Sequence, residues 1–209
     1  MRLSPIAASK SYSEAKRDKI LAVASELFLE LGYNRVSVNA IVRKAGGTKT
    51  NIYTYFGGKE GLFRAIIESL SKEISQSLVQ IDITNLSPQE ALNAFGRKYL
   101  SVVFSKQAVE LHRLTIAESR QFPELGRIWY QAGPEDGYQE LGKYIFQQQQ
   151  LGRFKNYEPR LAATQFLGML ESDIYLQLML GLRETPSDKE IDTLVSETVK
   201  AFLLLINED

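Results

Sequence analysis

Hydrophobic residues recur at intervals of three and four positions along almost the whole chain, which is the spacing of one face of an α-helix. No segment alternates between apolar and polar residues with the period of two that marks a half-buried strand. The pattern therefore predicts an all-α protein. The stretch near the N-terminus shows it clearly, with an apolar stripe of Ile20, Val23, Ala24, Leu27, Phe28 and Leu31.

Capping residues, glycines and prolines divide this pattern into separate helices. Ser11 and Glu14 have the spacing of a capping box ahead of a first helix that runs to Leu31. A break is expected at Gly133-Pro134. Because the fourth helix is too long for the small module before it, we place a domain boundary near residue 60, between a three-helix domain (1–60) and a larger all-α domain (61–209). The later helices are predicted over 38–45, 49–56, 59–81, 88–105, 107–119, 122–132, 135–150, 158–181 and 187–206.

Residues 37–55 have the pattern of two short helices joined by a tight turn, with Ser37 and Thr48 as N-caps and Gly46-Gly47 between them. This arrangement is typical of a helix-turn-helix, whose second helix enters a major groove about 12 Å wide. The alternative is an ordinary αα-hairpin, which any all-α protein can contain. The second helix would present no acidic residue outward: the set is Thr48, Lys49, Thr50, Asn51, Tyr53, Thr54 and Tyr55.

Charge is distributed unevenly along a chain whose net charge is zero. Residues 1–60 hold 10 Lys and Arg against 5 Asp and Glu, and residues 61–209 hold 15 against 20. A basic first third fits a nucleic-acid module fused to another domain, although chance clustering on a solvated surface gives the same count.

Composition excludes several classes of protein. The chain has no cysteine and one histidine, His112, so we expect no disulfide, no thiol catalysis and no metal site. Glu118, Glu171 and Asp173 form no recognisable catalytic pair, and we predict no enzyme activity, catalytic residue or cofactor. We find no apolar run of about 20 residues and no signal peptide. The expected location is the cytoplasm, on the nucleoid, with no membrane contact.

The stretch Ala45–Leu62, which reads AGGTKTNIYTYFGGKEGL, resembles the signature of the TetR family of transcriptional regulators. Upstream residues also fit the first helices of that family, and the match extends from Ala22 to Leu62. Two positions depart from it. Gly47 stands where valine is usual, so a buried turn contact is missing, and Thr50 stands where the recognition helix usually has glycine.

The resemblance implies roles for the residues of this hairpin. Lys49, Thr50 and Asn51 would read bases near the start of the recognition helix, whereas Tyr53 and Tyr55 would touch the phosphate backbone or a thymine methyl. Ser37 and Thr48 would meet phosphates, or act as helix caps alone. Tyr53 has the alternative of half-buried packing. Lys59, at a helix N-terminus, would attract a phosphate.

The second half of the chain resembles the C-terminal domain of the AefR-like branch, at residues 113–125, 165–170 and 180–182. The resemblance implies a sensor and dimerisation domain. The last two helices, over 158–181 and 187–206, are apolar on more than one stripe and could form a four-helix interface across a two-fold axis. Burial within one subunit would explain the same pattern. The predicted interface residues are Leu167, Leu170, Ile174, Leu178, Leu194, Val195 and Phe202.

A ligand pocket between the middle helices would be apolar with a few polar groups. Each candidate could equally be a core residue. The predicted lining is Tyr99, Phe104, His112, Ile116, Trp129, Tyr130, Phe166 and Tyr175.

Together these patterns predict a homodimeric DNA-binding regulator. The main hypothesis is a repressor that an apolar or amphipathic small molecule releases from a palindromic operator. The alternative is a protein of the same fold that has no inducer and acts through a protein partner.

Overall fold

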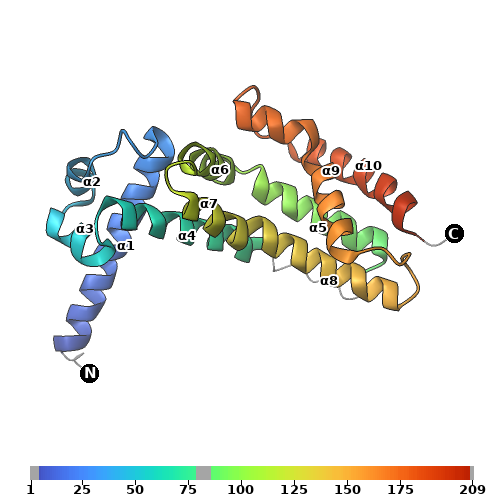
Figure 1. Cartoon of the computed structure of the whole chain (residues 1–209), viewed down its shortest axis with the longest axis horizontal. Coiled ribbons are helices and arrows are strands. Elements are labelled where there is room, and N and C mark those ends of the chain that lie inside the picture. Colours follow the sequence, from blue (N-terminus) through green and yellow to red (C-terminus); the bar gives the residue numbers. More distant parts are fainter. Residues whose placement is uncertain (1–4, 79–85, 208–209) are drawn as a thin grey trace. The chain divides into compact units, whose positions relative to one another are not determined.

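The structure is a computed structural model that describes residues 5–78 and 86–207, with side chains from Ser13 onward. Within these residues every named secondary-structure element is a helix, which confirms the predicted all-α class (Figure 1). The elements are α1 (Pro5–Leu31), α2 (Val38–Ala45), α3 (Lys49–Phe56), α4 (Lys59–Leu78), α5 (Pro88–Val103), α6 (Lys106–Glu118), α7 (Pro123–Tyr130), η1 (Gln131–Glu135), α8 (Asp136–Gln150), α9 (Pro159–Leu180) and α10 (Asp188–Ile206).

Two predicted boundaries are wrong. Helix α1 begins at Pro5 rather than after Ser11, because proline suits the first turn of a helix and nothing stops the helix before Leu31. The expected break at Gly133-Pro134 is absent, since the π-helical turn η1 joins α7 to α8. A proline in a helix clashes with the carbonyl four residues earlier, and the wider π-turn accommodates this ring without ending the helix. The predicted last turn of the fourth helix, at residues 79–81, lies outside the described residues.

Helix α9 contains a kink that the sequence does not indicate. Ser172 has φ 42° and ψ −149°, and it is the non-glycine residue with a positive φ among those described. A residue with a side chain rarely adopts this backbone conformation, so the surrounding structure must hold Ser172 in it. The kink follows directly after Glu171, whose side chain lines the cavity described below.

One compact unit consists of the described residues up to Leu70 together with Glu110–Ile128. Helix α1 packs against α2 and α3 and buries Ile20, Ala24 and Phe28 in the middle of the unit. Four rings, which we call the head cluster, join α1, α4 and the segment before α7. Phe28 stacks on Tyr33 at 5.7 Å, and Phe63 and Phe122 lie 5.2 Å from Phe28 and 4.9 Å from Tyr33, respectively, between ring centroids. The head cluster therefore joins three separate parts of the sequence in the core of this unit.

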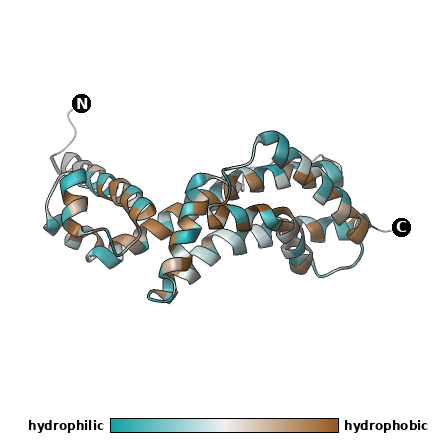
Figure 2. Ribbon diagram, turned by 90° about the horizontal axis from the view of Figure 1, so that it is seen from above, coloured by the Kyte–Doolittle hydropathy of each residue, from teal (hydrophilic) through white to brown (hydrophobic). Residues whose placement is uncertain are grey.

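The second unit consists of the described residues of Ser71–Val109 and those from Trp129 onward. Helix α8 packs along α9, and α10 packs against α5 and α9 (Figure 1). Hydrophobic and hydrophilic residues alternate around these helices, as amphipathic packing requires (Figure 2). The division of the chain at residue 60 into a DNA-binding and a sensor domain stays a prediction.

The core of the second unit contains most of the predicted dimer residues. Ile174 and Leu194 are partly buried against this core. Helical spacing shows that a residue is apolar but not which neighbour covers it, and here the neighbours belong to the same subunit. Four of the predicted residues are buried within the subunit: they are Leu167, Leu170, Leu178 and Val195. Phe202 is 2% exposed and lines a surface groove between α9 and α10.

No helix within residues 5–78 and 86–207 is long and apolar enough to cross a membrane.

Gly61 is the tightest point of the corner between α3 and α4. A Cβ atom at Gly61 would lie 1.8 Å from the carbonyl oxygen of Phe56. We expect Gly61→Ala to lower the free energy of unfolding by about 1–3 kcal/mol, because the first turn of α4 must move away from Phe56. Urea denaturation measures this change.

Gly126→Ala is the matched control, since it adds the same methyl group to α7 with its nearest neighbour, Ser119 Cβ, at 3.6 Å. Alanine at this position should leave the stability unchanged or raise it by about 0.5–1 kcal/mol. Equal effects of the two substitutions would contradict the close approach at Gly61.

Candidate DNA-binding site and cavity

The hairpin of α2 and α3 is fixed at both ends by caps. The Ser37 hydroxyl accepts a hydrogen bond from the Ala40 amide at 3.1 Å, which starts α2 as predicted. Helix α2 ends where the Gly46 amide donates to the Val42 carbonyl at 2.9 Å. Gly46 and Gly47 both have positive φ, at 75° and 118°, so glycine's conformational freedom makes this turn.

Asn51 has a structural role that the sequence analysis did not assign. Its Oδ1 accepts hydrogen bonds from the Thr48 amide and the Thr48 hydroxyl, each at 3.0 Å. This is the capping box with asparagine in place of the usual glutamate, and that shorter side chain is why the sequence pattern was missed. A Cβ atom on Gly47 would lie 3.0 Å from Asn51 Oδ1, so glycine leaves room for the cap.

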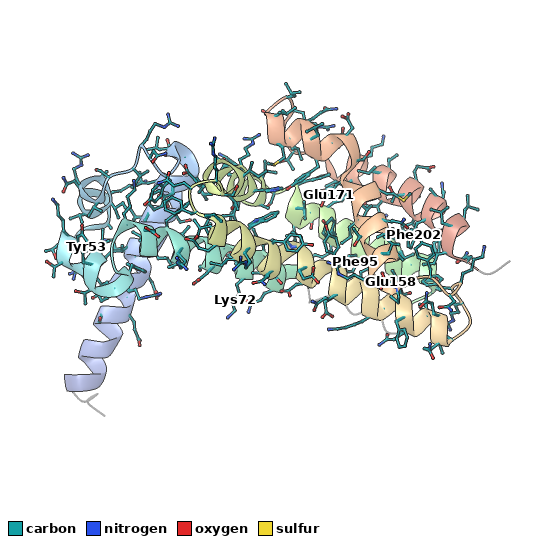
Figure 3. All side chains as sticks on the ribbon, viewed as in Figure 1. Tyr53, Lys72, Phe95, Glu158, Glu171 and Phe202 are labelled. Atoms are coloured by element: carbon teal, nitrogen blue, oxygen red, sulfur yellow. The ribbon has the colours of Figure 1, made fainter. Side chains whose placement is uncertain are left out.

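The outer face of α3 is open to solvent. Lys49, Thr50 and Thr54 are exposed, and Tyr53 is 60% exposed, so its ring is not half-buried packing (Figure 3). Ile52 is fully buried on the opposite side. Helix α3 therefore presents a polar, protruding face held from behind by the unit's core.

Tyr55 differs from the other predicted contacts because it is partly buried. The Ser13 hydroxyl of α1 donates a hydrogen bond to the Tyr55 hydroxyl at 3.1 Å. Arg17, also on α1, lies over the Phe56 ring at 5.1 Å. These contacts attach the end of α3 to α1.

Lys59 begins α4, but its ammonium lies over the Tyr33 ring, 4.0 Å from the centroid. Burial lowers the pKa of Lys59, and the nearby Glu118 carboxylate opposes that change. A phosphate contact would therefore require Lys59 to leave a cation–π site.

A further basic side chain lies beside the turn. A Cβ atom on Gly47 would be 3.2 Å from Lys16 Cε, which places the Lys16 side chain next to the start of α3. The sequence could have indicated Lys16, because α1 has a single apolar stripe and Lys16 lies outside that stripe, upstream of Ile20. Residues 31–59 hold five Lys and Arg and no Asp or Glu, so the turn and both short helices carry only positive formal charge.

The second unit contains a cavity of about 60 Å³. Three of the predicted pocket residues line it: Tyr99, Trp129 and Tyr175. Phe104 and Phe166 are buried core residues, while Tyr130 and Ile116 are exposed, the latter by 55%. Ile116 and His112 belong to the other unit. Ser71 and Glu171 also line the cavity and were not predicted. A polar residue in a helix usually faces solvent, and the sequence gives no sign that these two face a cavity instead.

Among the described residues, no three His, Asp or Glu side chains are grouped so that they could hold a metal ion. Burial lowers the pKa of His112 to about 4, so its imidazole is neutral at pH 7.

Two families match this chain, and together they cover most of it. Residues 20–66 match bacterial regulatory proteins of the tetR family, and residues 90–205 match the AefR-like transcriptional repressor C-terminal domain.

Among curated proteins, the chain is 34% identical over 96 residues to the HTH-type transcriptional regulator LmrA of Bacillus subtilis, which is 46% of this chain and 50% of that one. It is 29% identical over 115 residues to RutR of Escherichia coli K12, which is 55% of this chain and 46% of that one. The chain thus spans about half the length of these relatives.

Solved structures match over nearly the full length. A putative TetR-family regulator from Mesorhizobium loti is 25% identical, with a TM-score of 0.79 over 94% of this chain and 98% of that one. The flavonoid-responsive regulator FrrA is 29% identical, also with a TM-score of 0.79, over 93% of this chain and 98% of that one.

The cap between Thr48 and Asn51 predicts an effect that is independent of DNA. Asn51→Ala should lower the free energy of unfolding of the free protein by about 0.5–2 kcal/mol, because it removes both hydrogen bonds of the cap. Thermal or urea denaturation without DNA measures this loss.

Thr50→Ala is the control, since Thr50 immediately precedes Asn51 in the same helix and its side chain is exposed. Its effect on stability should stay within about 0.5 kcal/mol. If Asn51→Ala were equally silent, the side chain would not act as a cap.

Proposed function

Because the chain belongs to the TetR family of bacterial transcriptional regulators, we propose that it is a homodimeric repressor released from a palindromic operator by a small molecule. The observation that carries the proposal is the exposed, acid-free outer face of α3, held by caps at its start and by a buried Ile52 behind it.

Lys49, Thr50 and Tyr53 are the residues we assign to base reading. They protrude from the first turns of α3, the part of a recognition helix that reaches base edges. Asn51 is less suited to this role, because a bidentate contact with adenine needs the same Oδ1 that now accepts from Thr48. We propose that Ser37 and Thr48, at the N-termini of α2 and α3, contact DNA backbone phosphates through helix-terminal amides. Lys16 would add a positive charge at the same place. Tyr55 and Thr54 would support this contact from the end of the helix, and Lys59 would join if it left Tyr33.

The outer faces of α9 and α10 are the surface we assign to the dimer. At the end of α10, Leu204 and Leu205 are 84% and 64% exposed. Leu205 lines a mainly apolar groove of about 580 Å³ with Gly168 and Gln165 of α9. Exposed apolar patches of this kind mark interfaces, and a two-fold axis would place the same face of a second copy against it. A dimer would also match two operator half-sites one helical turn apart.

Release requires two protein conformations, one that binds DNA and one that does not. The ligand must have the higher affinity for the conformation that does not bind DNA. Helices α4, α6 and α7 each contribute residues to both compact units and also line the cavity, through Ser71, Ala108 and Trp129. These continuous helices are the route by which we expect a change at the cavity to reach α3. The structural neighbour FrrA is described as flavonoid-responsive, which supports a small-molecule signal. A partner-controlled protein without an inducer would be favoured by a closed core, whereas this core contains a cavity.

Sequence selection tests the DNA-binding part of the proposal. Full-length protein should recover a short inverted repeat from a library of random duplexes. Lys49→Ala should relax specificity at one or two positions of each half-site, at a cost of about 1–3 kcal/mol. Lys16→Ala should weaken binding to all sequences alike and reduce the salt dependence. Lys189→Ala, an exposed lysine of α10, should change neither.

Recovery of no sequence motif, with binding that only salt abolishes, would contradict sequence-specific recognition.

The dimer face makes a separate prediction. Leu205→Glu should convert the dimer to a monomer in analytical ultracentrifugation, because it places two charges in an apolar interface. Leu151→Glu is the matched control: it is also an exposed leucine, 62% exposed, but lies outside the groove. A dimer that survives Leu205→Glu and Gly168→Glu would show that another surface is used.

A further inference from the structure

The cavity of the second unit has a composition that points to a particular class of ligand. Apolar and aromatic groups from α4, α5, α7 and α9 form most of its wall, including Ile74, Trp129 and Tyr175. Among the described residues that line it, Glu171 is the charged one, and no Lys, Arg or His takes part. The cavity therefore has an apolar body and a single acidic end.

Glu171 is placed in this wall by the turn of α9 just before the kink at Ser172 (Figure 3). Within the described part of the chain it accepts one hydrogen bond, from the Tyr99 hydroxyl of α5 to Oε1. Burial raises the pKa of Glu171, which the bond from Tyr99 only partly opposes. No basic side chain lies in this wall, so the hydrogen bond from Tyr99 only partly offsets the cost of burying the ionised carboxylate.

Ser71 supplies a second and independent sign of a missing ligand. Its side chain lines the cavity from α4 and is only 2% exposed. The Ser71 hydroxyl oxygen makes no hydrogen bond with any described residue. Buried hydroxyls nearly always have a partner, because an unmet one costs about 1–3 kcal/mol.

We propose that this cavity binds a small organic cation, an amine whose N–H groups donate to Glu171 and Ser71 while its carbon body packs against Trp129 and Tyr175. This inference rests on the proposed function, since it names the class of ligand that the sensor recognises. A cation removes the cost of the buried charge, and the faces of aromatic rings attract it further. A neutral alcohol or phenol would add one hydrogen bond and leave the charge buried. A carboxylate would be repelled by Glu171.

The volume of the cavity limits the size of the ligand. About 60 Å³ is less than the roughly 150 Å³ of a cavity that binds benzene, so an ammonium head and a few carbons fit without movement. A ring requires the wall to open. The strained backbone at Ser172 is the place where α9 can change conformation when Glu171 moves, because strain there is relieved by rotation.

Binding of a cation should be linked to pH in a defined direction. The titratable groups facing Glu171 are Tyr99 of α5, Tyr138 of α8 and Tyr175 of α9, and all three have raised pKa values, mainly through burial. These phenols stay neutral at pH 7, so the titration belongs to Glu171. A carboxyl with a raised pKa is partly protonated near that pKa, and a cation favours the ionised form. Binding therefore releases protons, and affinity rises with pH until Glu171 is fully ionised.

The test uses the full chain without DNA and three probes of similar shape that are small enough for the cavity: propylamine, propan-1-ol and propanoate. Trp129 is the only tryptophan of the sequence and lines the cavity, so its fluorescence reports occupancy. We expect the amine to bind at least ten-fold more tightly than the alcohol, and the carboxylate not to bind. Calorimetry over a pH series should show amine affinity that rises with pH until Glu171 is fully ionised, with proton release at the acid end of the series.

Substitutions locate the effect. Glu171→Gln should weaken amine binding at least ten-fold and leave alcohol binding within two-fold. Glu184→Gln removes an equal charge from the exposed segment after α9 and should change neither. Ser71→Ala should weaken amine binding without destabilising the free protein, because it removes an unpaired hydroxyl.

Several results would overturn the inference: equal or tighter binding of the alcohol or the carboxylate, no binding of any probe, or amine affinity that falls as the pH rises through the acid range. Should Glu171→Gln fail to fold, the wild-type comparison of probes and pH values still decides. These measurements need no DNA, so they separate from the operator experiment. If the protein selects an operator but binds no amine, only this inference fails. If it binds the amine but selects no operator, only the proposed repressor function fails.

Discussion

The recognition hairpin depends on a packing constraint. Helices α2 and α3 have eight residues each, which is too short for a helix to be stable alone in water. Ile41 and Ile52 are fully buried, and both helices pack against α1. Helix α1 also contributes Phe28 to the head cluster, which it forms with Tyr33, Phe63 and Phe122. Since Phe122 comes from the segment between α6 and α7, the core that supports the hairpin is built from two distant parts of the sequence. Arg64 and Glu124 add an ion pair at 3.2 Å across the same junction.

The position of Phe122 shows what the segment 113–125 does in the structure. It was singled out in the sequence because it resembles the AefR-like branch, and in the structure it completes the core of the DNA-binding unit. Helix α7, which follows Phe122, ends next to Trp129 and the cavity wall. Helix α4 begins next to the hairpin and later contributes Ser71 to the same cavity. A repressor controlled by a ligand needs such shared elements, because a ligand acts only by changing the relative stability of two conformations.

Most of the fold was accessible from the sequence, and what was missed has identifiable causes. Helices α2 and α3 begin where Ser37 and Thr48 predict, because a cap is a local interaction between residues three apart. The π-turn at Pro134 and the kink at Ser172 were missed, since both depend on packing from other helices. The same holds for the candidate sites. Protruding residues such as Lys49 follow from helical spacing, whereas the burial of Val195 and Phe202 in their own subunit, and the place of Glu171 beside Tyr99, exist only in three dimensions.

The central claim is that the exposed face of α3 enters the major groove in two symmetric copies. Hydroxyl-radical footprinting of the full chain on a selected duplex tests it most directly. The account predicts two equivalent protected patches centred roughly one helical turn apart, about 34 Å. Dimethyl sulfate methylation of the same complex should show guanine N7 protection in the major groove of each patch. Protection of a single patch, of a continuous tract, or of the minor groove alone would contradict it.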